Sequence, residues 1–231
     1  MITEKRFQFY GRRKGKSLRR HHSELMDQLL PHLRVALDDP LAPAHDPRWL
    51  EIGFGGGEHL AHQAALHQEI SFIGAEPFIN GVAKLLALVE ANNLANLRIH
   101  DGDARPLLEA LPPASFERIY LLYPDPWPKA RHNKRRFVSA ETLAQFHRIL
   151  SPLGLFLFAS DIDDYVSWTR KHVAAHGGFT EEGDAAQPFP DWIETRYEAK
   201  ARREGRRPAY LTFRRQRPPT GALPNTPGPT M

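Results

Sequence analysis

Two kinds of apolar pattern alternate along the chain, and their order predicts its fold. Short runs of β-branched, leucine and aromatic residues predict buried strands, and longer segments with apolar residues three or four positions apart predict helices. The predicted strands are Trp49 to Ile52, Ser71 to Ala75, Leu97 to His100, Phe116 to Tyr123, Gly154 to Ala159, a weak strand near Phe179, and Ala209 to Arg214. The predicted helices between them are Glu58 to His67, Phe78 to Asn92, a brief one around Pro106 to Ala110, Ala140 to Leu150, and Ile162 to His176. This alternation predicts a Rossmann-like α/β fold, with a mostly parallel seven-stranded sheet and helices on both faces.

The segments at either end of the chain lack such patterns, so they set the domain boundaries. Residues 1–22 are rich in cations and predict a basic, flexible arm, whereas residues 216–231 contain five prolines and predict a disordered tail. The folded domain is therefore expected over residues 23–215. Its first helix is predicted over Ser23 to Leu37, with Ser23 as its cap, and Pro31 is expected to kink or divide it.

The charge of the chain is unevenly distributed. The net charge is +4, but 21 of the 31 Lys and Arg residues lie in three islands, residues 5–20, 129–136 and 200–217. The rest of the chain holds 10 cations and 26 acids, a balance of −16. Such islands on an acidic body favour local binding of a polyanion. In the first island the cations alternate with aromatic rings, which favours RNA over a merely solubilising tail.

Composition excludes several classes of protein and site. The chain has no cysteine, which excludes disulfides, thiolate nucleophiles and the common structural zinc sites, and we expect no metal site. No apolar run approaches the roughly 20 residues of a membrane-spanning helix, and no signal peptide is evident. We therefore expect a cytoplasmic protein that does not bind membranes. The sequence leaves the choice between monomer and homodimer open.

The first candidate for chemistry is the sequence EIGFGGG, which begins at Glu51 and follows the first strand of the sheet. Its glycines, Gly53, Gly55 and Gly57, allow a sharp turn and let a ligand approach the main chain closely. A dinucleotide-binding loop would need a glycine at position 58, where the chain has Glu58. The two acids beside the turn would repel a pyrophosphate but attract a cation such as the sulfonium of S-adenosylmethionine. The pattern therefore favours that cofactor and disfavours a nicotinamide dehydrogenase.

Acidic residues also follow the next strands of the predicted sheet. Glu76 lies 19 residues past Gly57, at a strand end where this fold places an acid against the ribose hydroxyls. Asp103 follows the third strand and could bind the adenine amino group, with Asp101 as the competing candidate. Because the carboxyl ends of parallel strands meet at one edge, we expect one crevice to be lined by Glu51, Glu76, Asp103 and Asp125.

The most distinctive stretch is LLYPDPWPKARHNKRR, residues 121–136. Three prolines exclude helix and strand pairing just after a strand end, and they enclose Asp125 and the large ring of Trp127. Five Lys or Arg residues follow between Lys129 and Arg136. A fixed acid, a ring and many cations suit an anionic substrate that carries a flat base. A stiff loop beside a solvated basic patch explains the stretch equally well when it is taken alone.

Two later motifs extend the same picture. Asp161 ends the fifth strand and is expected at the mouth of the crevice. The sequence TRYEAK, Thr195 to Lys200, precedes the third basic island. Without the other motifs it would be interpreted as a solvated helix with local charge pairs.

Together, and in this order, these motifs resemble the bacterial tRNA (guanine-N7-)-methyltransferase family. The resemblance covers about residues 6–214, and its most specific parts are YPDPWPKARHNKRR and TRYE. It implies a class I methyltransferase fold that transfers a methyl group from S-adenosylmethionine to N7 of a guanosine in the variable loop of tRNA, leaving S-adenosylhomocysteine. By the same resemblance, the cofactor or the reaction centre is contacted by Glu51, Gly53, Gly55, Gly57, Glu76, Asp103 and Asp125. The tRNA is contacted by Lys129, Arg131, His132, Asn133, Lys134, Arg135, Arg136, Asp161, Thr195, Arg196, Tyr197 and Glu198.

The expected chemistry assigns Asp125 an orienting role. Guanine N7 carries a free lone pair, so its methylation needs no general base. We therefore expect the Asp125 carboxylate to accept hydrogen bonds from the N1 and N2 edge of guanine. The ring of Trp127 either stacks on the base or packs the loop. Two rival interpretations are an amino-group methyltransferase, which would carry a Pro-Pro-aromatic clamp, and an RNA-binding module on a degenerate methyltransferase fold.

Overall fold

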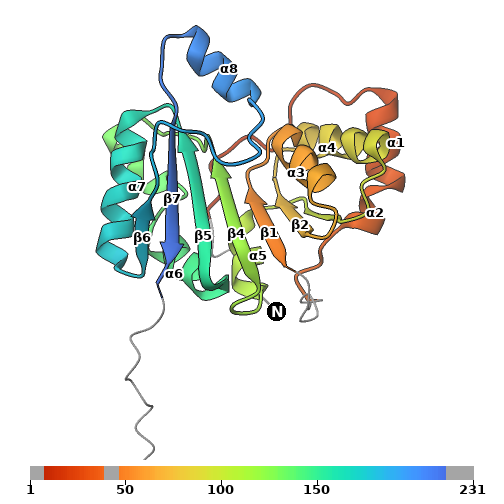
Figure 1. Ribbon diagram of the computed structural model, residues 1–231. Coiled ribbons are helices and arrows are strands. Elements are labelled where there is room, and N and C mark those ends of the chain that lie inside the picture. Colours follow the sequence, from red (N-terminus) through yellow and green to blue (C-terminus); the bar gives the residue numbers. More distant parts are fainter. Residues whose placement is uncertain (1–7, 39–46, 217–231) are drawn as a thin grey trace, which may run out of the picture.

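The computed structural model describes residues 8–38 and 47–216, and within them seven strands form one sheet (Figure 1). The strands are β1 (Arg48–Ile52), β2 (Ser71–Ala75), β3 (Leu97–His100), β4 (Phe116–Leu122), β5 (Leu150–Ser160), β6 (Phe179–Glu182) and β7 (Ala209–Arg215). Their order in the sheet is β3-β2-β1-β4-β5-β7-β6. The pairs on either side of β7 are antiparallel and the others are parallel. The predicted fold class is therefore confirmed.

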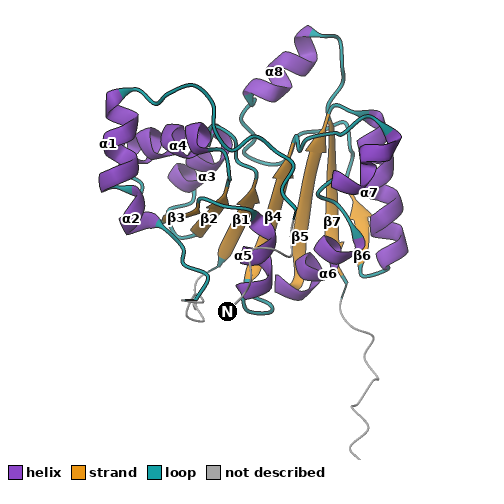
Figure 2. Ribbon diagram, turned by 180° about the vertical axis from the view of Figure 1, so that it is seen from behind, coloured by secondary structure: helices purple, strands orange, loops and turns teal. Residues whose placement is uncertain are grey.

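Helices cover both faces of the sheet, as Figure 2 shows from behind. They are α1 (Arg20–Gln28), α2 (Leu30–Leu33), α3 (Glu58–Leu66), α4 (Ile79–Asn92), α5 (Ala104–Ala110), α6 (Ala140–Ile149), α7 (Asp163–His176) and α8 (Arg196–Arg203), with a 3₁₀ helix, η2 (Ala130–Arg135). One apolar cluster joins the sheet to α5, α6 and α7, and a second joins the opposite face to α1, α3 and α4. Successive residues of a strand face opposite sides, so Leu50 belongs to the first cluster and Trp49 to the second.

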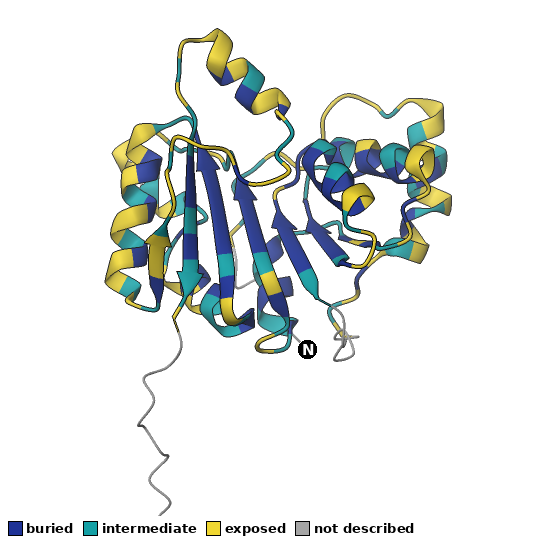
Figure 3. Ribbon diagram, viewed as in Figure 1, coloured by how far each residue is buried: buried dark blue, intermediate teal, exposed yellow. Residues whose placement is uncertain are grey.

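The central strands are buried on both faces, which explains their nearly continuous apolar sequence (Figure 3). In β5, for example, Phe156 and Phe158 are fully buried on one face, and Leu157 is buried on the other. By contrast, α8 projects beyond the carboxyl edge of the sheet and is mostly exposed (Figure 3). No helix among the described residues is long and apolar enough to cross a membrane.

The first helix departs from its prediction. α1 starts at Arg20, with Arg19 at its N-cap, and not at Ser23; the expected division near Pro31 is present, because a separate short helix, α2, follows. Pro31 lies in the first turn of α2, where the missing N–H breaks no hydrogen bond. The chain then runs beside β3, because the N–H of Val35 donates to the Ile99 carbonyl at 2.8 Å. The predicted tail, apart from Gln216, lies outside the described residues.

Candidate active site

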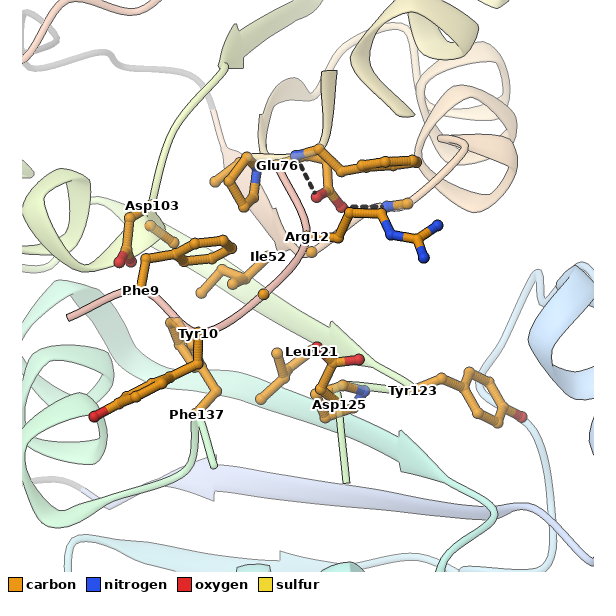
Figure 4. A pocket seen from close by; sticks show the side chains of 18 of the residues that line it. Phe9, Tyr10, Arg12, Ile52, Glu76, Asp103, Leu121, Tyr123, Asp125 and Phe137 are labelled. Carbon is orange, nitrogen blue, oxygen red and sulfur yellow. Dashed lines mark hydrogen bonds between the residues drawn. The ribbon is translucent and has the colours of Figure 1, made fainter. Parts of the chain in front are cut away.

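A cavity of about 460 Å³ opens at the carboxyl ends of β1, β2 and β4 (Figure 4). This is the edge of the sheet at which α/β folds bind their ligands, and the volume suits a small-molecule site. Five of the residues predicted to bind the cofactor line it, namely Gly53, Gly55, Glu76, Asp103 and Asp125. The structure therefore brings together acids from the ends of three strands and the glycine-rich turn.

The glycine-rich turn has a backbone that only glycine adopts easily. Gly53, Gly55 and Gly57 have φ angles of 71°, 58° and 79°, in the left-handed region. Gly57 is the N-cap of α3, and it lies outside the residues that line the cavity. On the other side of the turn, a Cβ atom on Gly81 would lie 2.1 Å from the Gly55 carbonyl oxygen. The first turn of α4 therefore packs directly on the main chain of the glycine-rich turn.

Glu76 connects this turn to α4. Its carboxylate accepts hydrogen bonds from the N–H of Gly55 at 2.7 Å and from the N–H of Phe78 at 2.9 Å. Burial raises the pKa of Glu76, and these two hydrogen bonds partly oppose the shift. Each oxygen has one protein donor here and can accept from another group. The carboxylate thus lies in the cavity wall with its orientation fixed and part of its accepting capacity free.

The structure also separates the two candidates that follow β3. Asp103 is the N-cap of α5, accepts from the N–H of Arg105 at 3.0 Å, and lines the cavity. Asp101 forms a two-fold hydrogen-bonded ion pair with Arg34, with distances of 2.9 and 2.8 Å, and is not among the lining residues. Of these two acids, Asp103 is therefore the one that a ligand in the cavity can contact.

The loop after β4 holds Asp125 at the open side of the cavity. Tyr123 and Trp127 flank it with φ angles of 49° and 44°, which are uncommon for residues other than glycine. Although Asp125 is accessible to solvent, the surrounding wall removes part of its hydration and raises the pKa of its carboxyl group. The ring of Trp127 lies edge-on to Tyr10 and 4.9 Å from the guanidinium of Arg135. In this structure Trp127 therefore packs the loop against the N-terminal segment.

Glu51, which was predicted to contact the cofactor, lies behind the cavity. It is 3 % exposed, and its carboxylate is 2.7 Å from Nδ1 of the buried His59 on α3. The reason is the alternation along β1: the side chain of Ile52 faces the cavity, and Glu51 lies on the opposite face, under α3. Glu51 can therefore support the glycine-rich turn but does not reach a ligand in the cavity.

The basic run after the loop splits into exposed residues and one buried residue. Lys129, Arg131 and Lys134 are exposed, and His132, Asn133 and Arg135 are partly exposed on η2. Arg136, predicted to contact tRNA, is instead only 3 % exposed and forms an ion pair with Asp164. The prediction for Arg136 was wrong because a run of cations in a sequence does not reveal which one turns inward.

The TRYE motif divides in the same way. Arg196 and Tyr197 are exposed on the first turn of α8, and Tyr197 lines the cavity beside Gly55. Thr195 is the N-cap of this helix and accepts from the N–H of Glu198 at 3.2 Å. Both of these residues are buried, so they stabilise α8 and are not available to tRNA as predicted.

The Glu198 carboxylate is a buried hydrogen-bond centre. It accepts from Trp192 Nε1 and from the Tyr210 hydroxyl, each at 2.6 Å, and from Arg202 at 2.7 Å. These donors come from the segment before α8, from β7 and from α8 itself. Glu198 therefore fixes the position of α8 above the sheet, and with it the position of Tyr197 at the cavity.

Asp161 is also engaged within the protein. Its carboxylate accepts from Arg206 Nε at 2.5 Å, its side chain is 14 % exposed, and it is not among the residues that line the cavity. The expectation that Asp161 faces the mouth of the crevice is therefore not met. Instead it ties the end of β5 to the segment between α8 and β7.

The sequence did not assign the N-terminal strap, residues 8–16, to the cofactor site. Phe9, Tyr10, Gly11 and Arg12 form part of the cavity wall. The Asn80 side chain holds the strap, because its Oδ1 accepts from the N–H of Gly15 and its Nδ2 donates to the Lys16 carbonyl, each at 2.7 Å. The rings among the cations were a visible signal in the sequence, but they were interpreted as favouring RNA.

Across residues 8–38 and 47–216, no group of three or more His, Asp or Glu side chains is arranged to hold a metal ion. Two carboxylates of the cavity already have partners within the protein: Glu76 accepts from two main-chain N–H groups, and Asp103 accepts from the main-chain N–H and the side chain of Arg105.

The sequence of this chain is similar to those of known methyltransferases, in agreement with the cavity described above. Residues 45–211 match a family described as putative methyltransferase. A tRNA (guanine-N(7)-)-methyltransferase of Agrobacterium fabrum is 54 % identical over 90 % of this chain and 95 % of its own length. One of Rhizobium meliloti is 52 % identical over 90 % of this chain and 94 % of its own.

Solved structures agree in fold. The 16S rRNA methyltransferase KamB superposes with a TM-score of 0.57 at 18 % identity, covering 74 % of this chain and 89 % of its own. The aminoglycoside resistance methyltransferase NpmB1 gives a TM-score of 0.53 at 16 % identity, covering 78 % and 91 %. On the strength of the sequence relatives, this chain belongs to the tRNA (guanine-N(7)-)-methyltransferase family.

Proposed function

We propose that this protein transfers the methyl group of S-adenosylmethionine to N7 of a guanosine in the variable loop of tRNA. One observation supports it above the others: Glu76 and Asp125 share a single cavity, with the glycine-rich turn on one side and the basic loop on the other. In this proposal Glu76 binds the cofactor and Asp125 binds the substrate base within the same space. The activity named for the relatives that share about half of its residues agrees with this arrangement.

The residues of the cavity fit the cofactor. Gly53 leaves the main chain open to a ligand, and the free lone pairs of Glu76 suit two ribose hydroxyls. Asp103 is placed to accept from the adenine amino group. When bound, S-adenosylmethionine supplies a methyl group on a positively charged sulfur, and S-adenosylhomocysteine remains after transfer. Negative charge from Glu76 and Asp125 favours that cation over the neutral product.

Asp125 has the role of holding the substrate base. Guanine presents two N–H donors, at N1 and N2, and a carboxylate can accept both. Binding this edge orients the opposite edge, which carries N7, and the negative charge stabilises the positive charge that develops on the purine. The lone pair of N7 is already free, so no proton has to leave before attack. Asp125 therefore acts by orientation and electrostatics and not as a general base.

The exposed cations form the tRNA-binding surface in this proposal. Lys129, Arg131 and Lys134 are exposed just after the Asp125 loop, Arg135 beside them is partly exposed, and Arg196 is exposed on α8. Contacts from these cations to phosphates offset the cost, about a few kcal/mol, of unstacking the target guanosine. Binding should therefore weaken steeply with salt. A tRNA substrate also agrees with a cytoplasmic location.

A direct test uses unmodified tRNA and purified protein. We expect S-adenosylmethionine-dependent formation of 7-methylguanosine, measured by nucleoside mass spectrometry, and chain cleavage at that nucleotide should place it in the variable loop. Asp125→Ala should lose turnover at saturating tRNA, whereas Asp163→Ala, an exposed acid at the start of α7, serves as the matched control. A methyl group on an exocyclic amine would instead identify an amino-group methyltransferase. Full turnover by Asp125→Ala would remove that residue from the mechanism.

A further inference from the structure

Arg136 differs from every other cation in the basic run to which it belongs. Its side chain has no exposed surface, whereas Arg131 and Lys134 of the same run are exposed. Burying a guanidinium is costly unless it is paired and hydrogen-bonded. A tRNA phosphate could not reach this side chain without unfolding its surroundings. The burial of Arg136 therefore needs an explanation other than RNA binding.

The partners of Arg136 show what it holds. Its Nε donates to the Pro126 carbonyl at 2.9 Å, and its Nη2 forms an ion pair with Asp164 on α7. Its guanidinium lies 5.0 Å from the ring centres of both Tyr165 and Trp168, within cation–π range. One charged group thus joins the loop after β4 to one face of α7.

The same face of α7 also holds the chain just after Arg136. The Tyr165 hydroxyl accepts from the N–H of Phe137 at 3.0 Å, and Trp168 Nε1 donates to the Val138 carbonyl at 2.8 Å. The loop is therefore attached to α7 at two places. Arg136 ties its beginning, at the Pro126 carbonyl, and the two bonds from Phe137 and Val138 tie its end. We call Arg136 with Asp164, Tyr165 and Trp168 the α7 clamp.

We propose that Arg136 is a positioning residue for the methyl transfer, because the α7 clamp holds the main chain next to Asp125 through the Pro126 carbonyl. Three torsions separate the Cα of Asp125 from the Pro126 carbonyl oxygen. The peptide bond is planar, the proline ring fixes φ of Pro126, and only ψ of Pro126 can vary. Little freedom separates the held oxygen from the residue that holds the guanine. This inference rests on the function proposed for Asp125 above.

The alternative role, a phosphate contact, makes the opposite kinetic prediction. Loss of a phosphate contact weakens tRNA binding in the ground state and in the transition state alike. It also lowers the slope of log K against log salt concentration by about one. Loss of a positioning contact leaves binding intact and slows the chemical step, because a misplacement of about 1 Å can reduce the rate by about 100-fold. The two roles can therefore be separated by kcat, KM and the salt slope.

The test compares Arg136→Lys and Arg136→Met with Arg131→Met, which removes an exposed cation from the same run. We expect both Arg136 variants to lose about 10- to 100-fold in kcat, with the tRNA KM and its salt slope as in the wild type. Arg131→Met should raise the tRNA KM and reduce the slope by about one. A raised KM and a reduced slope in Arg136→Met, with kcat retained, would overturn the proposal.

A second variant covers the case in which the Arg136 variants do not fold. Asp164 is 68 % exposed, so Asp164→Asn loosens the α7 clamp without vacating a buried site. It should lower kcat with KM unchanged, and an unaltered kcat would count against the clamp. Wild-type protein measured in the same assay separates the two levels: absence of 7-methylguanosine there refutes the proposed function, whereas a normal wild type with normal clamp variants refutes only this inference.

Discussion

The N-terminal strap leads to a prediction about cofactor affinity that can be developed in detail. Asn80→Ala removes both hydrogen bonds that hold Gly15 and Lys16 to the start of α4. The strap would then remain attached near there only through the bond from the Ile79 N–H to the Arg13 carbonyl, at 3.0 Å. Because strap residues form part of the cavity wall, the cofactor should bind less tightly when the strap is released.

The size of the effect follows from the two lost bonds. Each contributes about 0.5–1.5 kcal/mol net, and both are solvent-exposed, so about 1–2 kcal/mol is expected for the pair. At about 1.4 kcal/mol per tenfold change, this corresponds to roughly a 5- to 30-fold rise in the dissociation constant. Gly15→Ala should act in the same direction, because its Cβ would lie 2.8 Å from Asn80 Oδ1 and 3.0 Å from the Phe78 ring.

The assay is calorimetric titration of S-adenosylhomocysteine into the protein without tRNA. Asn92→Ala is the matched control, because Asn92 lies at the far end of the same helix and donates only to the Leu88 carbonyl. Trypsin should also cut wild-type protein at Arg12 and Arg13 more slowly when the ligand is bound. Equal affinity in the Asn80→Ala variant and the wild type would refute a contribution of the strap to cofactor binding.

Three further predictions concern the site and its support. Gly81→Ala places a Cβ 2.1 Å from the Gly55 carbonyl oxygen, so α4 must move and calorimetry should show weaker binding of S-adenosylhomocysteine. Glu198→Ala leaves the buried Tyr210 hydroxyl and the part-buried Trp192 N–H without an acceptor, and it should lower the free energy of unfolding by about 2–4 kcal/mol, measured by urea titration. Asp125 must be ionised to accept from guanine and its pKa is raised, so kcat should fall on acidification at a pH above the ordinary aspartate value of 3.8, and this limb of the pH–rate profile should disappear in Asp125→Asn.

The sequence predicted the parallel core of the fold well, for a physical reason. The bounds of β2, Ser71–Ala75, and of β3, Leu97–His100, coincide with the predicted ones. Strands buried on both faces must be continuously apolar, and such runs are visible without any knowledge of their neighbours. The insertion of β7 between β5 and β6 depends on which strands pair, which the periodicity of a single segment does not encode.

The site was predictable where function follows from position along a strand, and not where it depends on distant partners. Glu76 and Asp103 line the cavity as expected, because the end of a strand in this fold has a known location. Arg136 was misassigned because the partner that turns it inward, Asp164, lies 28 residues further along the chain. The hydrogen bonds of Asn80 go to main-chain groups of the strap, which every residue carries, so the side chains of the strap could not predict them.

The left-handed residues on either side of Asp125 have a consequence for the RNA. Tyr123 and Trp127, together with Pro124, Pro126 and Pro128, leave the loop few alternative backbone conformations. A loop with one fixed backbone conformation cannot change shape to fit the substrate. The tRNA must therefore change its own conformation to bring the guanosine into the cavity. We therefore expect kcat to increase with the ease of unstacking the target guanosine from the folded tRNA. Magnesium ions that stiffen the tRNA should slow methylation while leaving cofactor binding unchanged, which makes the reaction a reporter of tRNA flexibility.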